Sequence, residues 1–403
     1  MKLFSKESAE ELKVLWPFYL EAFLGTILFV LIPFEVVYFN SIGLNMKQVG
    51  VLIAVWPLAS LLFEIPTGAI ADLYGRKFSV MLGWFLQGLV FCSIFLVSDY
   101  YFLLALMALI GITSTFTTGS YDAWVIDLIK AKGLKNKVHD YFAKRQSLIN
   151  LAFVFSGVLG AVSVAFFGIK IIWPMSGLAL FLSVAFLYFG EEVYEKPKLR
   201  VKESFFKVWS QIKKSVSYGF RHRTLFLLLL IIFVWGLAFA FEGFISWTPF
   251  LKSYNFPDWG FGYLWSAMAL VGVFAPLLSK KITKKNKERK MLIITASLSL
   301  IMGFFVLAAN SLAFIIFLLF LGSFLVDFEM PIWNVYFHRH IPSKMRATIG
   351  SVRGMLFSLA GIVSLPLAGF TVDKFGGRIA VFIACMIAIP VIFLYSRIKG
   401  KNQ

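Results

Sequence analysis

The sequence predicts an all-α polytopic membrane protein, and its composition and hydropathy carry this prediction. Of the 403 residues, 59% are hydrophobic and only 15% are charged, whereas soluble domains are about 45–50% apolar and about 25% charged. Mean hydropathy is +0.82, and the apolar residues fall in runs of about 20, the length that a helix needs to cross a bilayer core. A water-soluble fold, a disordered chain and a collagen-like chain are therefore excluded.

Twelve apolar runs predict twelve transmembrane helices, six in each half of the chain. The first half gives 14–39, 49–73, 78–97, 101–129, 147–167 and 171–190, and the second half gives 225–251, 261–279, 291–309, 312–335, 348–372 and 379–396. The longest break, 191–224, separates the halves, a pattern typical of parallel internal repeats. We expect two six-helix bundles, 1–190 and 225–403, joined by a cytoplasmic linker at 191–224.

The linker carries apolar residues at helical spacing, at Phe205, Trp209, Ile212 and Val216, with lysines between them. This pattern predicts an amphipathic helix that lies on the inner leaflet. We expect it to act as a tether, and a partner-docking helix is the open alternative. The first apolar run is longer than the core of a secretory signal, so we expect it to stay in the membrane.

Positive charge is distributed unevenly among the connections between the predicted helices. The chain has 39 Lys and Arg against 21 Asp and Glu, a formal charge of +18, which in a soluble protein would indicate a nucleic-acid partner. Here 33 of the 39 fall at the termini and in connections on one side of the membrane, and 5 fall on the other side. Because basic loops stay in the cytoplasm, we expect both termini there, a location in the plasma (cytoplasmic) membrane, and no nucleic-acid partner.

A short motif stands between the second and third predicted spans, in a connection that we expect to be cytoplasmic. Residues 68–77 read Gly-Ala-Ile-Ala-Asp-Leu-Tyr-Gly-Arg-Lys. This stretch resembles the loop signature of the major facilitator superfamily, G-x-x-x-D-R-x-G-R-R/K. The matching positions are Gly68, Asp72, Gly75, Arg76 and Lys77, and Leu73 stands where the family usually has arginine. The predicted topology resembles that of the family over essentially the whole chain, whereas this loop is the one strong motif.

The resemblance implies the fold of the superfamily and a gate on the inner side. In the family, the carboxylate that matches Asp72 packs against the cytoplasmic end of the eleventh helix and latches the outward-open state. We expect Asp72, Arg76 and Asp127 to form this gate, with Arg76 or Arg145 as the partner of Asp127. A second stretch, 369–378, reads G-x-x-x-D-x-x-G-G-R but falls on the predicted outer side, where we interpret it as coincidence or turn chemistry.

Charged residues inside the predicted spans are the candidate binding and proton-coupling residues, because a charge in hydrocarbon is costly. They lie mainly in the first, fourth, seventh and tenth spans, which line the central cavity in the family that the sequence resembles. The candidates are Glu21, Glu35, Glu64, Asp122, Glu242, Asp327 and Glu329, opposed within the spans by Arg353. Each acid also has a structural alternative, as a helix cap, a water contact near a span end or, for Glu64, a partner of backbone freed by Pro66.

Helical arithmetic at about 100° per residue assigns these acids to faces. It places Glu21 and Glu35 on one face of the first span, and it places Asp122 on a face with the threonines at 115 and 118. In the tenth span, Asp327 and Glu329 point in nearly opposite directions. The two acids of the tenth span therefore cannot both face one cavity.

The acids, with aromatic neighbours, suit cations through charge and cation–π contact, and burial disfavours the ionised form of a carboxylate. Together with the resemblance, these features predict a secondary active transporter that works by alternating access and exports lipophilic or cationic small molecules, coupled to protons. Twelve helices enclose a complete pathway, so we expect a monomer whose partners are the lipid bilayer, a small-molecule substrate and protons.

Two other functions stay open. Arg353 could bind a carboxylate or a phosphate, which favours symport or facilitated uptake of a small nutrient or an organic anion. The fifth span lacks the Gly-Pro pair of the antiporter signature, so the direction of transport is open. The remote alternative is a membrane-embedded enzyme or a lipid-handling protein. The sequence holds no phosphate-binding loop, HExxH motif or paired CxxC, so we expect no enzymatic activity, cofactor or metal site.

Overall fold

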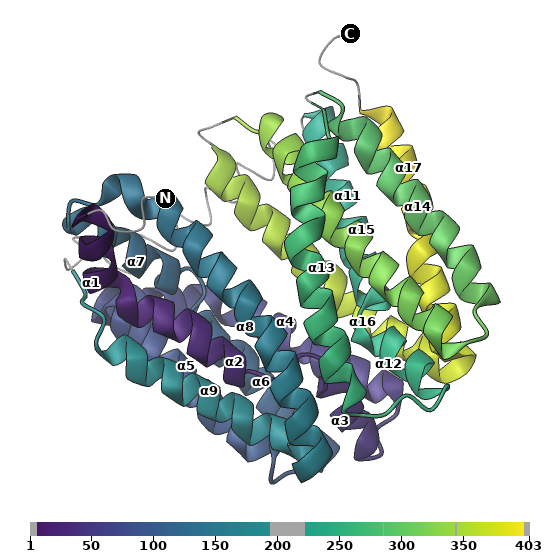
Figure 1. The fold of residues 1–403 in the computed structure, drawn as a ribbon, viewed down its shortest axis with the longest axis horizontal. Coiled ribbons are helices and arrows are strands. Elements are labelled where there is room, and N and C mark those ends of the chain that lie inside the picture. Colours follow the sequence, from purple (N-terminus) through teal and green to yellow (C-terminus); the bar gives the residue numbers. More distant parts are fainter. Residues whose placement is uncertain (1–5, 194–221, 285, 343–344, 399–403) are drawn as a thin grey trace. The chain divides into compact units, whose positions relative to one another are not determined.

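The structure is a computed structural model of the chain, and it describes residues 6–193, 222–284, 286–342 and 345–398. These residues form helices joined by short turns, with no strand among them (Figure 1). Ten of their helical stretches are long and apolar enough to cross a membrane. The all-α class is thereby confirmed, and the linker helix predicted at Phe205 to Val216 lies outside the described residues.

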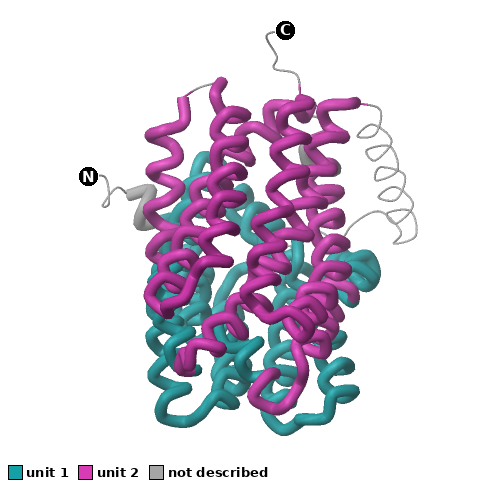
Figure 2. The backbone as a smooth tube through the Cα atoms, turned by 90° about the vertical axis from the view of Figure 1, so that its right-hand side faces the viewer, with its two compact units in different colours: residues 1–38, 59–201, 258–269 teal, residues 39–58, 202–257, 270–403 magenta. Residues whose placement is uncertain are grey.

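The chain forms two compact units (Figure 2). Unit 1 comprises Met1–Tyr38, Ala59–Val201 and Asp258–Ala269, and unit 2 comprises Phe39–Leu58, Lys202–Pro257 and Leu270–Gln403. Each unit therefore includes a segment from the other half of the sequence. Three helices, α3 (Glu35–Ser41), α4 (Met46–Tyr74) and α13 (Gly260–Ile282), are divided between the units.

Unit 1 is an all-helical bundle with a core of large aromatic and aliphatic side chains. Besides its parts of α3, α4 and α13, it contains α1 (Lys6–Leu20), η1 (Glu21–Gly25), α2 (Thr26–Leu28), α5 (Arg76–Ile94), α6 (Tyr100–Thr115), α7 (Ser120–Ala131), η2 (Lys135–Lys137), α8 (Val138–Phe167), η3 (Ile169–Ile171) and α9 (Ile172–Tyr188). Helix α5 packs against α6, α7 and α9. Phe18, Val80, Trp124 and Tyr141 lie almost fully buried in the core.

The first predicted span is interrupted, so the prediction that Glu21 and Glu35 share one helical face is wrong. Residues 21–25 form a π-helix, and the chain leaves the helix at Phe29 (φ −80°, ψ 81°) before α3 (Glu35–Ser41) begins. Pro33 disfavours helical backbone in the residue before it. The hydroxyl of Ser156 donates to the freed carbonyl of Phe29 at 2.8 Å, which offsets the lost helical hydrogen bond.

The fourth predicted span is also divided, into α6 and α7. Between them, residues 116–119 form turns, and Gly119 has a φ of +76°, which glycine adopts without steric cost. The hydroxyl of Ser79 donates to the carbonyl of Phe116 at 2.7 Å. Asp122 therefore lies in the first turn of a new helix, and the face that we predicted it to share with Thr115 and Thr118 does not exist.

Unit 2 is a second helical bundle. Besides its parts of α3, α4 and α13, it contains α11 (Arg223–Glu242), α12 (Phe244–Lys252), α14 (Glu288–Ala308), α15 (Leu312–Arg339), α16 (Arg346–Met386) and α17 (Ala388–Arg397). Helix α16 packs along α11, and α14 packs on α15, α16 and α17. The last two predicted spans fall in one helical stretch, Ile349–Arg397, which bends at Gly376 (φ 82°, ψ 162°).

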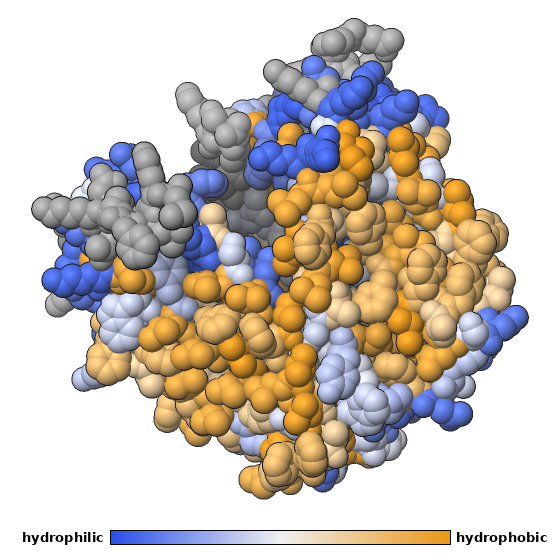
Figure 3. Space-filling model, in the orientation of Figure 1, coloured by the Kyte–Doolittle hydropathy of each residue, from blue (hydrophilic) through white to orange (hydrophobic). Residues whose placement is uncertain are grey.

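The surface is that of a protein in lipid. Figure 3 shows hydrophobic side chains over the middle of the helices and hydrophilic ones toward helix ends. Leu96, Phe166 and Phe274 are among the large apolar side chains that are exposed. Contiguous apolar surface of this kind is rare on soluble monomers, and helices that satisfy their own backbone are one of two structures able to span hydrocarbon. The chain is a multi-pass integral membrane protein.

Candidate functional site

The loop motif forms a sharp turn between α4 and α5 that is fastened to the end of α9. Gly75 has a φ of +100°, and a Cβ there would lie 3.0 Å from a carboxylate oxygen of Glu192. The same carboxylate accepts from the backbone amide of Lys77 at 2.9 Å. The ammonium of Lys77 donates to the carbonyls of Tyr188 and Gly190 at 2.7 and 2.8 Å, where a cation also complements the helix dipole.

Of the three residues predicted to form the inner gate, the structure brings two together. Arg76, the first residue of α5, forms an ion pair with Asp127 of α7, and both side chains are partly exposed. Asp72 lies exposed in the last turn of α4, and Gly68 is one turn before it. Arg145, the other partner that the sequence allowed for Asp127, lies beside Glu21 instead.

A buried network surrounds Glu21, which is only 6% exposed. The hydroxyl of Tyr121 donates to Glu21 Oε2 at 2.6 Å, and Arg145 Nη2 lies 3.8 Å from the same oxygen. The guanidinium of Arg145 also sits over the ring of Tyr121, 4.5 Å from its centroid. Residues from η1, α7 and α8 thus place a carboxylate, a phenol and a guanidinium within one buried cluster, which we call the Glu21 network.

A second buried carboxylate, Glu11, lies near the Glu21 network and was missed by the sequence analysis. It is 1% exposed, and its Oε1 accepts from Tyr19 at 2.6 Å and from Lys144 at 2.7 Å. The rings of Tyr19 and Tyr141 are 5.5 Å apart. Glu11 precedes the first apolar run, so a search for acids inside predicted spans could not find it.

Three predicted acids lie in unit 2. Glu329 is 8% exposed and accepts from the hydroxyl of Thr295 in α14 at 2.8 Å. Glu242 ends α11 against Gly322 of α15, where a Cβ would lie 3.3 Å from its Oε1. Asp327 faces a third helix, α13. None of these acids forms an ion pair within the part of the chain that the structure describes.

The two acids of the tenth predicted span face different helices, as the helical arithmetic predicts. Whereas Glu329 bonds to α14, Asp327 approaches Gly272 of α13, where a Cβ would lie 3.3 Å from a carboxylate oxygen. Alanine at Gly272 would therefore crowd the carboxylate. Only one of the two acids is presented to α13.

The remaining predicted residues are scattered. Glu35 is the first residue of α3, half-buried, and its Oε1 has no hydrogen-bond partner among the described residues. Glu64 and Asp122 are exposed. Arg353 donates to the side-chain oxygen of Asn334 at 2.9 Å and lies 5.6 Å from the ring centroid of Phe337.

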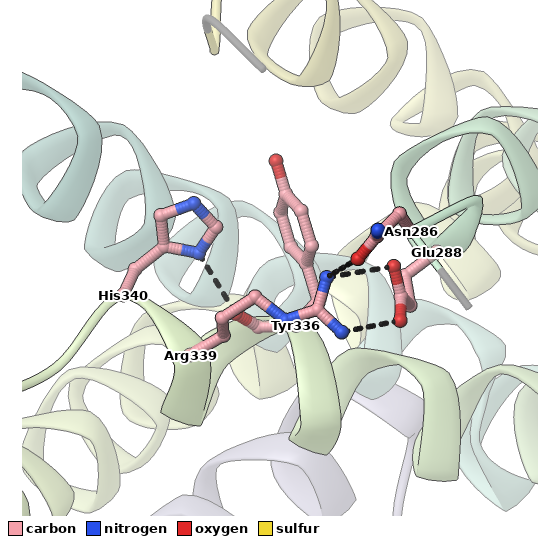
Figure 4. Close-up of polar contacts among 5 residues, drawn as sticks. All are labelled: Asn286, Glu288, Tyr336, Arg339 and His340. Carbon is pink, nitrogen blue, oxygen red and sulfur yellow. Dashed lines mark hydrogen bonds and ion pairs between the residues drawn. The ribbon is translucent and has the colours of Figure 1, made fainter. Parts of the chain in front are cut away.

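An ion pair that the sequence analysis missed joins α14 to α15 (Figure 4). Arg339 donates to both carboxylate oxygens of Glu288, at 2.6 and 3.1 Å, and to Asn286 at 3.1 Å. Beside it, His340 Nδ1 lies 2.9 Å from the carbonyl of Tyr336. Glu288 begins its helix and Arg339 ends the next one, so the pair ties a helix start to a helix end.

The Glu288–Arg339 pair repeats the Arg76–Asp127 pair with the charges exchanged. Glu288 lies 212 residues after Arg76, and Arg339 lies 212 residues after Asp127. The same offset relates two helix caps, Asp99 before α6 and Ser311 before α15. Because the acid and the base have changed places, a search for a second copy of the motif could not detect this pair.

The described residues hold no group of three or more His, Cys, Asp or Glu that could bind a metal ion. The acids named above are instead distributed as isolated carboxylates or in pairs with cations and hydroxyls. Such an arrangement can exchange protons or bind an organic cation.

Comparison with known proteins places these features in context. A family model described as Major Facilitator Superfamily matches residues 18–365. The uncharacterized MFS-type transporter YxaM of Bacillus subtilis is 23% identical over 92% of this chain and 93% of its own length. The multi-drug resistance efflux pump PmrA of Streptococcus pneumoniae is 23% identical over 94% of this chain and 93% of its own length. The crystal structure of the nucleoside transporter NupG shares the fold, with a TM-score of 0.79 at 12% identity, over 97% of this chain and 100% of that one.

Proposed function

The chain belongs to the Major Facilitator Superfamily, and from this premise we propose that it is a secondary active transporter that works by alternating access. Its substrates are lipophilic or cationic small molecules, which it exports in exchange for protons. The proposed topology has twelve transmembrane helices with both termini in the cytoplasm, in the plasma membrane, and the transporting unit is a monomer. The uneven distribution of Lys and Arg supports this topology.

The Glu21 network is the observation that carries the proposal of proton coupling. An ionised carboxylate buried away from water needs compensation, which Tyr121 and Arg145 supply. When Glu21 takes up a proton, its charge no longer attracts Arg145, and the guanidinium keeps its contact with the ring of Tyr121. The network therefore has two states that differ by one proton, which is what a coupling site requires.

The proposal of cation export has separate support. Glu242, Asp327 and Glu329 supply acidic groups without a cationic partner among the described residues, so a cationic substrate could provide the missing charge. The relative PmrA is named as a multi-drug resistance efflux pump. Asp127 with Arg76, and Asp72 at the end of α4, are proposed to form the inner gate.

The test uses everted vesicles with an inside-acid pH gradient reported by a dye. Lipophilic cations are expected to collapse the gradient in the wild type and to leave it intact in Glu21→Gln, because the amide cannot exchange a proton. The matched control is Glu10→Gln. It removes an exposed acid from α1, the helix that leads into η1 and Glu21. Asp122→Asn tests whether Asp122, the residue after Tyr121, is the coupling acid instead. Coupling that survives in Glu21→Gln contradicts the assignment of Glu21.

The alternative function is uptake of an organic anion or another small nutrient, and Arg353 is the observation that favours it. Its described hydrogen bond goes to the amide of Asn334 and not to a carboxylate, so an anionic substrate could take the place of that amide. Counterflow of an organic acid or a sugar in proteoliposomes, lost in Arg353→Ala, would establish uptake. If cations collapse the gradient equally well in Arg353→Ala, export stands.

A further inference from the structure

We propose that Asp373 is a latch that holds the start of α4 against α16 and that is released during each transport cycle. The proposal rests on alternating access as proposed above, and it concerns the side that the proposed topology places outside the cell. The inner gate then has a counterpart at the opposite end of α4.

The contact is made by a carboxylate that clamps the beginning of a helix. Asp373 Oδ1 accepts from the backbone amide of Met46 at 2.9 Å, and its Oδ2 accepts from that of Lys47 at 2.8 Å. The first amides of a helix have no partner within the helix, and the helix dipole favours a negative charge there. A single exposed carboxylate thus joins two segments that lie more than 300 residues apart in the sequence.

Helix α4 does not need Asp373 in order to begin. Asn45 already accepts from the amide of Gln48 at 2.9 Å, and Gln48 Oε1 accepts from the amide of Asn45 at 3.0 Å. This reciprocal pair is a capping box, which satisfies the start of a helix locally. The remaining function of the Asp373 contact is to join α4 to α16.

Glycines bring the two backbones into direct contact beside the latch. A Cβ at Gly369, one turn before Asp373, would overlap the carbonyl of Met46, and a Cβ at Gly50 would overlap the carbonyl of Leu365. The contacts run in opposite directions along the two helices, so the helices are antiparallel. An interface of backbone and glycine can separate without repacking large side chains.

The close contact is confined to this end of α16. At Gly350 and Gly354, near the start of the helix, a Cβ would meet no described atom within 4 Å. Gly350 and Gly354 are spaced as a GxxxG step, which permits close approach of another helix. In this structure the contact at Gly369 is made while the step at Gly350 is open.

The stretch around Asp373 has the same turn as the loop motif, which supports the interpretation of their resemblance as turn chemistry. In both, a glycine stands four residues before the aspartate and another three residues after it. Gly376 (φ 82°, ψ 162°) and Gly75 (φ 100°, ψ 153°) have nearly the same backbone conformation. The structure therefore contains one turn motif after the end of α4 and another at the bend of α16.

A basic residue two positions after the second glycine anchors each of these turns. Arg378 donates to the carbonyls of Leu307 and Ala309 at 3.2 and 2.7 Å, and to the hydroxyl of Tyr254 at 2.6 Å. In the corresponding place, two residues after Gly75, Lys77 donates to the carbonyls of Tyr188 and Gly190. The turn that carries Asp373 is thus held by its bonds to Tyr254 and to the end of α14, so Asp373 can release α4 without losing its own position.

The experiment measures the distance across this interface by pulsed electron paramagnetic resonance. Spin labels at Ser41→Cys and Lys374→Cys, both exposed, report on the contact in a background with Cys92 and Cys385 replaced. We expect Asp373→Ala to raise the ratio of long to short distances at least about tenfold, which corresponds to about 1.4 kcal/mol. The matched control is Asp99→Ala, because Asp99 caps only its own helix, at Phe102; it should leave the ratio unchanged.

Gly369→Ala is an independent variant that retains the carboxylate. Its methyl group would overlap the carbonyl of Met46, so the ratio should move in the same direction as in Asp373→Ala. A wild-type ratio in both variants overturns the proposal. The readout needs neither substrate nor a pH gradient. If distances shift in Asp373→Ala while Glu21→Gln keeps its proton coupling, the assignment of Glu21 as the coupling residue is wrong and the latch stands.

Discussion

Tyr121 and Tyr19 make the same bond to two different carboxylates, which allows the proposed coupling site to be tested one hydrogen bond at a time. Each phenol donates at 2.6 Å, Tyr121 to Glu21 and Tyr19 to Glu11. Hydrogen bonds to charged groups contribute about 1.5–3 kcal/mol to stability. The two phenylalanine variants should therefore lower the free energy of unfolding by similar amounts.

Their effects on transport should differ. In Tyr121→Phe, Glu21 loses a donor that stabilises its ionised form, so proton-coupled export should fall several-fold. In Tyr19→Phe, Glu11 keeps Lys144, and export should stay near that of the wild type. Thermal unfolding in detergent and the everted-vesicle assay measure the two quantities. Equal losses of export in both variants would show that the effect is structural.

Only part of the candidate site could be predicted from the sequence. A carboxylate inside an apolar run is visible in the sequence, so Glu21 and Glu329 were identified. Their partners were not, because Tyr121 and Arg145 lie 100 and 124 positions away from Glu21 and only the folded chain brings them together. Glu11 lacked even the first signal, because it stands outside the apolar run that it helps to anchor.

Glycine contacts determine which helices can pack closely against one another. A Cβ at Gly157 of α8 would overlap the carbonyl of Gly262 and the hydroxyl of Ser266, both in the part of α13 that belongs to unit 1. Because a neighbouring backbone cannot move aside cheaply, Gly157→Ala should lower the free energy of unfolding by about 1–3 kcal/mol.

The control for this prediction is Gly361→Ala in α16, where a Cβ would meet nothing within 4 Å. Alanine in a helix interior is favoured over glycine by about 0.5–1 kcal/mol, so this variant should be as stable as the wild type or slightly more stable. Thermal unfolding followed by intrinsic fluorescence compares the two. If Gly157→Ala unfolds at the wild-type temperature, the α8–α13 contact is looser than the structure shows.

Helix positions were predicted well and helix interruptions were not. Apolar runs of about 20 residues located α4, α5 and α9 within a few residues. The breaks at Phe29 and at Gly119 lie inside such runs, because in lipid a break is tolerated where a nearby hydroxyl satisfies the freed carbonyl. Ser156 and Ser79 do so here, and neither contact is encoded near the break.

At the scale of the whole molecule, the charge-exchanged ion pairs should contribute unequally to stability. The side chains of Arg76 and Asp127 are 35% and 48% exposed, and exposed pairs contribute only about 0–1 kcal/mol. Glu288 has 8% side-chain exposure and a two-pronged partner in Arg339. Glu288→Gln should therefore lower the free energy of unfolding by about 1.5–3 kcal/mol, clearly more than Asp127→Asn.

Exchanging the charges of Arg76 and Asp127 tests whether export needs an attractive ion pair at this place or the arginine itself. Arg76→Asp alone places two acids together, and the double variant with Asp127→Arg restores an attractive pair of the kind found at Glu288 and Arg339. We expect the single variant to lose export and the double variant to regain part of it. Export that stays absent in the double variant would mean that Arg76 itself, and not the ion pair, is required.

Alternating access predicts that the two ends of α4 act on one equilibrium. Asp72 lies in the last turn of this helix, and Asp373 clamps its start at Met46. Met46 and Asp72 are 26 residues apart, or about 39 Å along a helix. Effects at such distant sites add in free energy. Asp373→Ala should favour the state open on the outer side and Asp72→Ala the state open on the inner side, so the double variant should return within about threefold of the wild-type ratio, or about 0.7 kcal/mol. Spin-label distances for Ser41 and Lys374, recorded in all four proteins, measure this balance. A double variant that matches either single variant would show that the latches act on separate motions, and alternating access through α4 would then have to be abandoned.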